Sequence, residues 1–432
     1  MNEINQKQKL PEGWKWVNGG TDIFLIPGTR PFGGATDEGI PSLGGEHITM
    51  DGRVRFNETN AKFVPFKFYN SIDRGKAKIN DILINKDGAN TGKVAILRKM
   101  FAPYIMVNEH VFIVRSKSFF DQNFLFYYLF SHYGQNQIKS KITGSAQPGL
   151  SSSFIKSFYL LFPTLSEQQK IAEILETVDN AREKTDAIIE KYKRIKKGLM
   201  QELLTKGIDE NGKIRTEKTH RFKDSPLGRI PEGWKWVRLG DVIAKIGDGG
   251  TPSRNEVDNF GGDIPWVVIE DVKKYIVDTK EKLTLKGLRY SNAKLWKKGS
   301  IILSFGATIG EVGIAKISVA TKQGIAGLEP KEGIINTNFL YFVLLNQKDA
   351  LLRYANQTTI PEVRPNTLKE KVIFPLPPLS EQQRIAEILS QIDEVIEKET
   401  QYRDKLKRLK AGLMEDLLTG KVEVNHLIKE EA

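Results

Sequence analysis

The chain has 432 residues, no cysteine and a formal net charge of +12 at pH 7. This length fits two to four domains, and the absence of cysteine excludes disulfides and thiolate metal sites. The N-terminal stretch is polar and the apolar runs are too short to cross a bilayer, so we expect a cytoplasmic protein without a membrane segment.

Two marker sequences occur twice along the chain. "LPEGWKWV" from Leu10 returns as "IPEGWKWV" from Ile230, and "LSEQQKIAEILE" from Leu165 returns as "LSEQQRIAEILS" from Leu379. Such a repeat predicts two copies of one unit, each with an opening tag, a globular body and a long helix. The predicted segments are a first body (1–165), a first rod (166–205), a linker (206–229), a second body (230–378), a second rod (379–420) and a tail (421–432).

Each body reads as a mixture of helices and short strands. Residues 81–97 and 300–315 each show the pattern of a strand, a glycine-rich turn and a strand. Apolar runs from Asn123 and Asn338 predict a buried helix in each body. The predicted fold class is therefore α+β, with two similar mixed α/β bodies.

The rods carry the strongest periodicity. We predict Ser166 and Ser380 as helix N-caps, each with a glutamine three residues later. Heptads follow, and we assign the core columns of the first rod to Ile171, Val178, Thr185, Tyr192 and Leu199 and to Ile174, Ala181, Ile188 and Ile195. The second rod gives Ile385, Ile392, Glu399, Leu406 and Leu413, with Ile388, Val395, Tyr402 and Leu409.

The chain path predicts how the rods lie. The second body follows the far end of the first rod, so antiparallel coiled-coil packing with a pseudo-twofold axis is the simplest arrangement. Gly198 and Gly412 inside the rods suggest close approach of another helix, or otherwise fraying of the helix end.

Positive charge is concentrated in the bodies. Residues 1–165 carry 20 basic and 13 acidic side chains, and residues 206–378 carry 28 and 20. The rods are nearly balanced, with 8 and 8 in residues 166–205 and 9 and 12 in residues 379–432. This distribution favours a polyanion as partner, although a merely soluble basic protein would show it too.

No motif in the chain predicts catalysis. "GANTGKV" from Gly88 lacks the spacing and the hydroxyl residue of a phosphate-binding loop, and the five histidines show no metal-ligand spacing. Two basic bodies on a stiff spacer suit duplex DNA with two separated half-sites. The sequence therefore indicates binding rather than chemistry.

Several motifs resemble the DNA specificity subunit of type I restriction and modification systems. They are "IPEGWKWV", "GDGGTPSRN…GGDIPWV", "SFGATIG" and "PLPPLSEQQRIAEIL", and the resemblance covers nearly the whole chain. The first body departs from it, with "GTRP" from Gly28 in place of "GGTPS" and Ser42 in place of Trp266.

The resemblance implies two target recognition domains, each reading one half of a bipartite asymmetric site in double-stranded DNA. It implies rods that space these domains and dock two methyltransferase subunits, with motor-nuclease subunits joining for restriction. It also implies a non-catalytic chain without a cofactor, whereas S-adenosylmethionine, ATP and Mg belong to the partner subunits.

Candidate contact residues come from glycine-rich loops with polar tips and from the exposed rod faces. The DNA-binding candidates are Arg30, Lys86, Asn90, Thr91, Lys93, Thr251, Ser253, Arg254, Ser304 and Thr308. The partner-binding candidates are Gln168, Gln169, Arg194, Gln382, Gln383 and Arg408. Two other functions stay open at this stage: a self-contained restriction enzyme with an unrecognised centre, and a protein scaffold that does not bind DNA.

Overall fold

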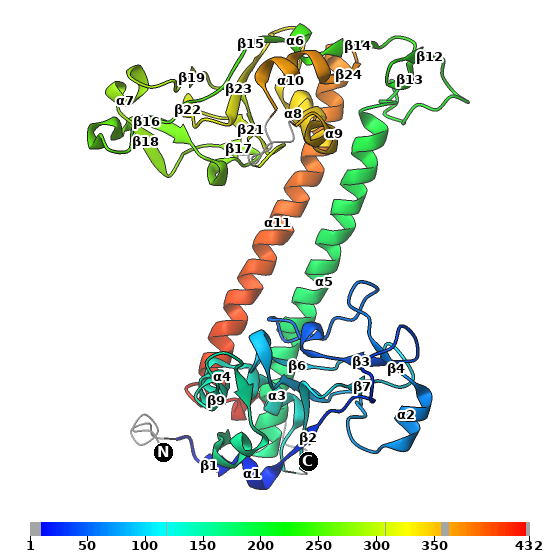
Figure 1. Cartoon of the computed structure of the whole chain (residues 1–432), viewed down its shortest axis with the longest axis vertical. Coiled ribbons are helices and arrows are strands. Elements are labelled where there is room, and N and C mark those ends of the chain that lie inside the picture. The colour runs from blue at the N-terminus through cyan, green and yellow to red at the C-terminus, as the bar shows by residue number, and fades with distance from the viewer. Residues whose placement is uncertain (1–9, 118, 307, 356–362, 429–432) are drawn as a thin grey trace. The chain divides into compact units, whose positions relative to one another are not determined.

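The computed structural model describes residues 10–117, 119–306, 308–355 and 363–428. The chain forms two compact units. Unit 1 comprises Met1–Asp186 and Gln401–Ala432, and unit 2 comprises Ala187–Thr400. Each unit contains one body and a part of both long helices (Figure 1).

The first body is built around an antiparallel sheet with the strand order β2-β8-β5-β6. A sheet β4-β3-β7 and the pairs β1-β11 and β9-β10 complete its strands. The strands are β1 (Lys15–Asn18), β2 (Ile23–Pro27), β3 (Ile40–Leu43), β4 (Phe63–Val64), β5 (Ile82–Asn85), β6 (Val94–Ile96), β7 (Met106–Val107), β8 (Val111–Ser116), β9 (Ile142–Thr143), β10 (Gly149–Leu150) and β11 (Tyr159–Phe162). The helices are α1 (Gly19–Asp22), α2 (Phe66–Ser71), α3 (Gln122–Phe130) and α4 (His132–Lys139).

The second body repeats this plan with a sheet β15-β23-β20-β21-β17 and a sheet β18-β16-β22-β19. The strands of the linker and of the second body are β12 (Phe222–Ser225), β13 (Gly228–Pro231), β14 (Lys235–Arg238), β15 (Ile243–Gly247), β16 (Phe260–Val267), β17 (Tyr275–Ile276), β18 (Glu281–Leu283), β19 (Leu295–Trp296), β20 (Ile301–Ser304), β21 (Val312–Ala315), β22 (Val319–Thr321), β23 (Ile325–Pro330) and β24 (Ile373–Leu376). The helices are α6 (Leu239–Val242), α7 (Leu285–Arg289), α8 (Thr337–Asn346), α9 (Lys348–Arg353) and α10 (Pro365–Lys371). The predicted mixed α/β fold of both bodies is confirmed.

Helices α3 and α8 are the predicted buried helices. Asp121 caps α3 by accepting from two backbone N–H groups of its first turn, and Asn336 caps α8 by accepting from one. Six consecutive residues of each helix are buried, so each helix is apolar on all sides and fills the core of its body.

The repeated tryptophan of each opening tag fixes the body to the start of its helix. Trp14 Nε1 donates to Glu167 at 3.1 Å, and Trp234 Nε1 donates to Glu381 at 3.0 Å. Both tryptophans are buried, and buried indole N–H groups require such an acceptor. The same joint is therefore built twice.

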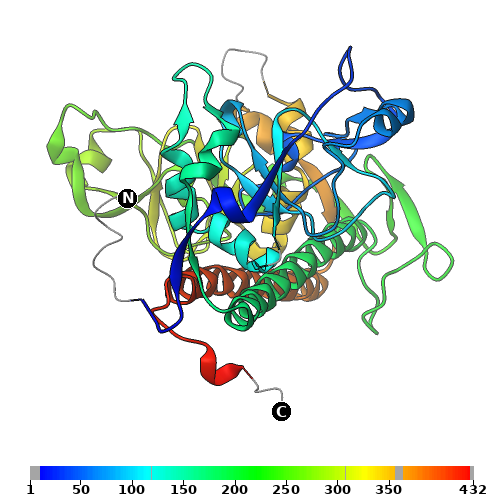
Figure 2. The same ribbon diagram turned by 90° about the horizontal axis from the view of Figure 1, so that it is seen from below.

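The rods are the helices α5 (Leu165–Leu203) and α11 (Leu379–Leu417), of 39 residues each. In unit 1 Leu175, near the start of α5, shares a core with Leu417 at the end of α11. In unit 2 Leu203, at the end of α5, shares a core with Leu389 near the start of α11. The two helices therefore run antiparallel, as predicted (Figures 1 and 2).

One ion pair recurs in both units with its partners exchanged between the helices. Lys410 of α11 binds both carboxylate oxygens of Asp179 of α5 at 2.7 Å in unit 1. Lys196 of α5 binds Asp393 of α11 at 2.6 Å in unit 2, where Lys274 also reaches Asp393 at 2.8 Å. The exchange is what an internal twofold repeat of the chain produces.

The second predicted core column of each rod is wrong by one residue. In α5 the buried positions after Ile171 include Leu175 and Ile189, whereas Ile188 and Ile195 are exposed. In α11 the corresponding positions are Leu389, Ile396, Arg403, Lys410 and Leu417, whereas Tyr402 and Leu409 are exposed. The column includes long cations that pair with acids, so it does not look apolar in the sequence.

The predicted caps are also displaced. Helix α5 begins at Leu165, so Ser166 lies inside its first turn. The reciprocal bonds form instead between Thr164 and Glu167, whose carboxylate accepts from Thr164 N at 2.9 Å. In α11 the first turn bonds to the carbonyl of Pro378, which has no side-chain acceptor.

Gly198 and Gly412 do not mark a close helix approach within the described chain. A Cβ atom built at either residue meets nothing within 4 Å, and both helices continue beyond the glycine, which argues against fraying there as well.

We therefore predict that Gly198→Ala and Gly412→Ala each raise the free energy of unfolding by about 0.5–1 kcal/mol, because alanine loses less backbone entropy in a helix. Urea denaturation followed by circular dichroism measures the change. Gly207→Ala is the opposite control, because its backbone has φ +63° and its Cβ would lie 2.2 Å from the Trp234 ring. A destabilised Gly198→Ala variant would contradict the prediction.

Candidate nucleic-acid interface

Polar loops gather at one end of the central sheet of the first body. The antiparallel registers place Pro27 opposite Phe112 and Asn85 opposite Val111, so β2 and β5 end where β8 begins. The loops that meet there are 28–39, 86–93 and 108–110. We call this surface the first polar end.

A network of charged side chains crosses the first polar end. The His110 ring lies 2.7 Å from Asp87 through Nδ1 and 3.1 Å from Glu109 through Nε2. Arg30 Nε reaches Glu109 at 2.8 Å, and Lys86 lies 3.8 Å from Asp87. Three loops that are distant in sequence are thereby held to one another, while their side chains stay partly exposed to a ligand.

An open hollow of about 620 Å³ lies beside this network and is lined by both Asn85 and His110. Asn85 is buried, and its Nδ2 donates to the carbonyl of Asp87 at 2.7 Å. Its Oδ1 has no hydrogen-bond partner among the described residues. A buried acceptor without a partner costs free energy, and a donor from a bound molecule would satisfy it.

Glu46 and Lys62 form part of the wall of this hollow and pair at 2.5 Å. Burial alone would raise the pKa of Glu46, but the hydrogen bond and charge of Lys62 outweigh it and hold the pKa below its usual value. The carboxylate therefore stays ionised, and this wall is an ion pair with its lysine half exposed.

The second body has the same surface at the matching end of its sheet. Strands β15 and β20 end at Gly247 and Ser304, where β23 begins at Ile325. The loops that meet there are 248–256, 305–311 and 322–324. We call this surface, as far as the structure describes it, the second polar end.

Part of the backbone hydrogen-bond pattern is the same at the two polar ends. Four bonds of the first body are matched by four of the second. Gly28 N donates to Val111 O as Gly249 N does to Ile325 O, and Thr29 N donates to Val107 O as Gly250 N does to Thr321 O. Asn85 N donates to Lys93 O as Ser304 N does to Glu311 O, and Lys86 N donates to His110 O as Phe305 N does to Gly324 O.

The side chains at these corresponding positions differ in chemistry. Arg30 corresponds to Thr251, Lys86 to Phe305 and His110 to Gly324. Two surfaces with one backbone frame and different polar groups are suited to bind two different partners of the same general shape.

Gly28 and Gly249 hold equivalent places in this frame and are required there by space. A Cβ atom at Gly28 would lie 2.0 Å from the carbonyl oxygen of Asn108, and one at Gly249 would lie 2.1 Å from that of Thr321. Any side chain would push the loop away from its neighbour, so both residues set the position of the polar tips that follow them.

The structure divides the candidates of the first body between two places. Arg30, Lys86 and Asn90 lie at the first polar end. The Thr91 hydroxyl is used within the loop, because it donates to the carbonyls of Gly88 and Pro148. Lys93 lines a separate hollow beside α4, together with His132 and Lys139 among others.

The candidates of the second body divide in the same way. Thr251, Ser253 and Thr308 are exposed at the second polar end. Arg254 is folded back onto Glu281, with its two Nη atoms 2.6 and 3.0 Å from the carboxylate oxygens, and lies over aromatic rings. Its hydrogen bond to Glu281 raises the pKa of Arg254, so its charge is already paired within the body.

Ser304, which the sequence analysis names as a DNA-binding candidate, is buried in the structure. The side chain is 2% exposed, because its hydroxyl donates to the carbonyl of Thr308 and accepts from Glu311 N at 2.9 Å. Ser304 therefore closes the turn that presents Thr308, and the single proton of its hydroxyl is used within that turn.

The predicted exposure of Gln168 and Gln382 is wrong as well. They are 0% and 1% exposed. Gln168 accepts from Asp121 N at 2.9 Å, and Gln382 accepts from Asn336 N at 2.8 Å, so both tie a rod to the cap of a buried helix. The other candidates on the rods are exposed, namely Gln169, Arg194, Gln383 and Arg408.

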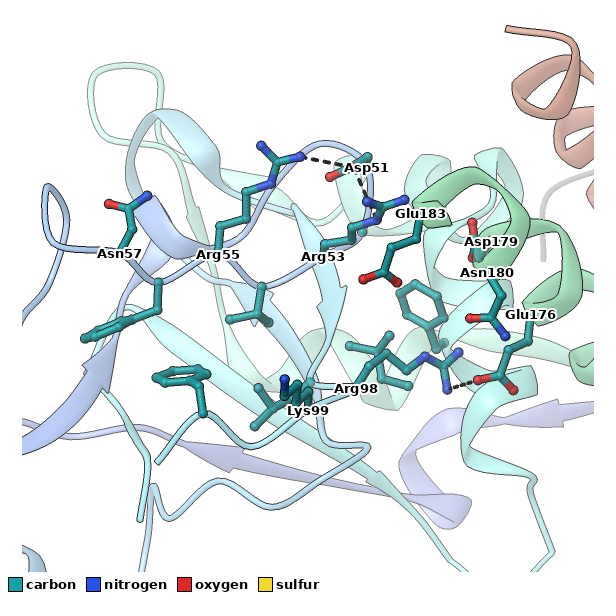
Figure 3. Close-up of a pocket in the computed structure, with 17 residues that line it drawn as sticks. Asp51, Arg53, Arg55, Asn57, Arg98, Lys99, Glu176, Asp179, Asn180 and Glu183 are labelled. Atoms are coloured by element: carbon teal, nitrogen blue, oxygen red, sulfur yellow. Dashed lines mark ion pairs between the residues drawn. The ribbon is translucent and has the colours of Figure 1, made fainter. Parts of the chain in front are cut away.

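A more enclosed cavity of about 460 Å³ lies where the first body meets α5 (Figure 3). Its wall carries acids and cations in balance, with Arg98 bound to Glu176 at 3.3 Å and Arg53 to Asp51 at 3.5 Å. None of the ten DNA-binding candidates lines it. The cavity therefore belongs to the joint between body and rod, not to the polar end.

Sequence analysis missed Asn85, Asp87, Glu109 and His110. These residues lie at or near the end of β5 and the start of β8, and antiparallel pairing brings those two strand ends together. The polar character of the residues at these strand ends was the signal that could have found them. Glycine-rich spacing found two of the three loops that contribute and missed the loop 108–110.

Two searches of the described residues gave no site of another kind. No group of three or more His, Cys, Asp or Glu side chains in this part of the chain is arranged to hold a metal ion. No helix among the same residues combines the length and apolar character needed to span a membrane.

Comparison with known proteins gives consistent matches. A family model described as the type I restriction modification DNA specificity domain matches residues 55–194 and 231–408. The type I restriction enzyme MjaVIII specificity subunit of Methanocaldococcus jannaschii is 27% identical over 439 residues, covering 97% of this chain and 95% of that protein.

Solved structures share the fold. The crystal structure of a type I restriction-modification system S subunit from M. genitalium has a TM-score of 0.60 and 17% identity, and the match covers 95% of this chain and 98% of that one. A chain from a structure on complex assembly and conformational transition of the type I R-M system has a TM-score of 0.55 and 19% identity, covering 96% and 100%.

Proposed function

Because the chain belongs to the type I restriction-modification DNA specificity family and is a non-catalytic specificity subunit of such a system, we propose that each polar end reads one half of a bipartite, asymmetric duplex target. The observation that carries this proposal is the shared backbone frame with different side chains at corresponding positions. A shared frame would hold DNA in the same geometry at both half-sites, and different side chains would select different bases.

Charge supports DNA as the ligand of both bodies. Segments 1–165 and 206–378 carry excess positive charge, whereas the segments that contain the rods do not. Lysine and arginine on a DNA-binding surface gain free energy by releasing counterions from phosphates. In this proposal Arg30 and Lys86 make such contacts at the first polar end, and the exposed hydroxyls of Thr251, Ser253 and Thr308 donate hydrogen bonds at the second.

The rods have two roles in this proposal. They set the spacing between the half-sites, and their exposed residues Gln169, Arg194, Gln383 and Arg408 contact two methyltransferase subunits. S-adenosylmethionine then sits on the methyltransferases, and ATP and Mg on motor-nuclease subunits that join for restriction. The chain contributes recognition and assembly to the complex.

Exchange of one body tests the proposal. The full chain is assembled with its methyltransferase subunits, and its methylated sites are mapped on genomic DNA. Replacing residues 1–165 by the equivalent body of a relative is expected to change one half-site and to leave the other half and the spacer length intact. A single continuous site, a change in both halves, or binding without sequence preference would overturn the proposal.

A further inference from the structure

The side chain of one phenylalanine is fully exposed at the first polar end. Phe32 has a relative exposure of 109%, the highest of the large apolar side chains in the described residues. It follows Pro31 in the loop after β2, two residues beyond Arg30. Single exposed apolar residues are common on protein surfaces, so the exposure needs a second observation before it carries an argument.

The second observation is that this tip is ordered by its own backbone. Gly34 N donates to Pro31 O at 3.2 Å, and Gly33 has φ +89°, which is the hydrogen bond and the left-handed third residue of a type II turn. Phe32 occupies the second position of this turn. The turn therefore fixes the place and direction from which the ring projects into solvent.

Both arms of the turn are fixed to the body. On one side Arg30 pairs with Glu109 in the network of the first polar end. On the other, Thr36 and Phe63 exchange two backbone hydrogen bonds, at 2.9 and 3.1 Å. An anchored turn presents its tip with little loss of conformational freedom on binding.

The surroundings of the ring favour DNA over a protein as its partner. A protein-binding hot spot needs a cluster of apolar neighbours that exclude water, whereas Phe32 is followed by Gly33 and Gly34 and lies two residues from Arg30. A Cβ atom at Gly33 or Gly34 would meet nothing within 4 Å, so the tip is slender enough to enter a narrow space. A single ring on a slender tip is the form of an apolar wedge that opens a base step.

On this basis, and resting on the proposed function, we propose that Phe32 inserts between adjacent base pairs of the half-site that the first body reads. The corresponding turn of the second body, as far as the structure describes it, holds no equivalent wedge, and there Arg254 folds back over the Phe260 and Trp266 rings. Only one half-site should therefore be opened. The phenylalanine ring carries no charge, so the wedge contributes stacking and not a phosphate contact.

The test uses the full chain assembled with its methyltransferase subunits and duplexes carrying 2-aminopurine, one position at a time, across the mapped target. In the wild type, fluorescence should rise at one step of the first-body half-site, in addition to any signal from the adenine that the methyltransferase flips out. Phe32→Ala should abolish the first signal, keep the second and weaken binding about tenfold. The loss should be the same at low and moderate salt, because no phosphate contact is removed.

Two control variants sharpen the result. Phe32→Trp should keep the fluorescence signal, since a larger ring stacks at least as well. Phe119→Ala should leave signal and affinity unchanged, because Phe119 is 64% exposed but follows the opposite end of β8. Wild-type affinity and fluorescence in Phe32→Ala, with site preference intact, would overturn the wedge alone. A wild-type complex that shows no site preference at all would overturn the proposed function and the wedge with it.

Discussion

Replacing Lys410 by alanine should destabilise unit 1 by about 3–5 kcal/mol, because it leaves the carboxylate of Asp179 in the helix seam without its cation. Lys410 is 6% exposed, and burial lowers its pKa while Asp179 opposes that shift. Amide hydrogen exchange measures this loss of stability. Protection should fall in α3 and in the α5 segment of unit 1.

Unit 2 offers a matched comparison for this variant. Lys196→Ala removes the equivalent cation, but Asp393 keeps Lys274 at 2.8 Å, so the loss there should be clearly smaller. Lys407 is an exposed residue of α11, the helix that carries Lys410, and Lys407→Ala should change the free energy of unfolding by less than about 0.5 kcal/mol. Equal losses in all three variants would show that the buried pair is not what stabilises the seam.

A double variant distinguishes the contribution of the ion pair from that of side-chain packing in the helix seam. Asp179→Leu combined with Lys410→Met places apolar side chains of similar length in the seam, and most of the stability lost in Lys410→Ala should return. The Tyr127 hydroxyl, which donates to Asp179 at 2.9 Å, would lose its acceptor, so recovery should be incomplete.

These lysines also explain where sequence analysis succeeded and failed on the fold. The repeat predicted two bodies and two antiparallel helices, because duplication and periodicity are both visible in one chain. The first core column, from Ile171 to Leu199, was predicted because its residues are apolar or aromatic, with Thr185 as the exception. The second was misplaced, because binary patterning rejects Lys196 and Lys410 as core residues until their acidic partners are known.

The polar ends show a related limit. Glycine-rich loops indicated the place of Arg30 and Lys86, since such loops accompany close backbone approach. Spacing did not reveal that His110 joins them, because this contact depends on strand pairing across more than twenty residues. Nor did it give the direction of a side chain, which is why Ser304 was predicted as a contact although its hydroxyl bonds inward.

The paired glycines should produce the largest effect on recognition. Gly28→Ala is expected to weaken binding of the assembled complex to its target about 10- to 100-fold, since a displaced polar end loses contacts equal to one or two mismatched base pairs. The physical reason is the Cβ atom 2.0 Å from the carbonyl of Asn108, which the backbone relieves only by moving the loop that carries Arg30. Gly249→Ala should have the same effect through the carbonyl of Thr321.

The two variants should differ in what they leave intact, and this difference tests the division of labour between the bodies. Gly28→Ala should lose discrimination in one half-site and Gly249→Ala in the other, measured with duplexes that carry single base changes in each half. Gly149→Ala and Gly233→Ala are matched controls, because a Cβ atom at either meets nothing within 4 Å. If both loop variants kept wild-type discrimination, the DNA would have to be read by another surface. The shared backbone frame of the two polar ends would then be only a consequence of the duplicated fold.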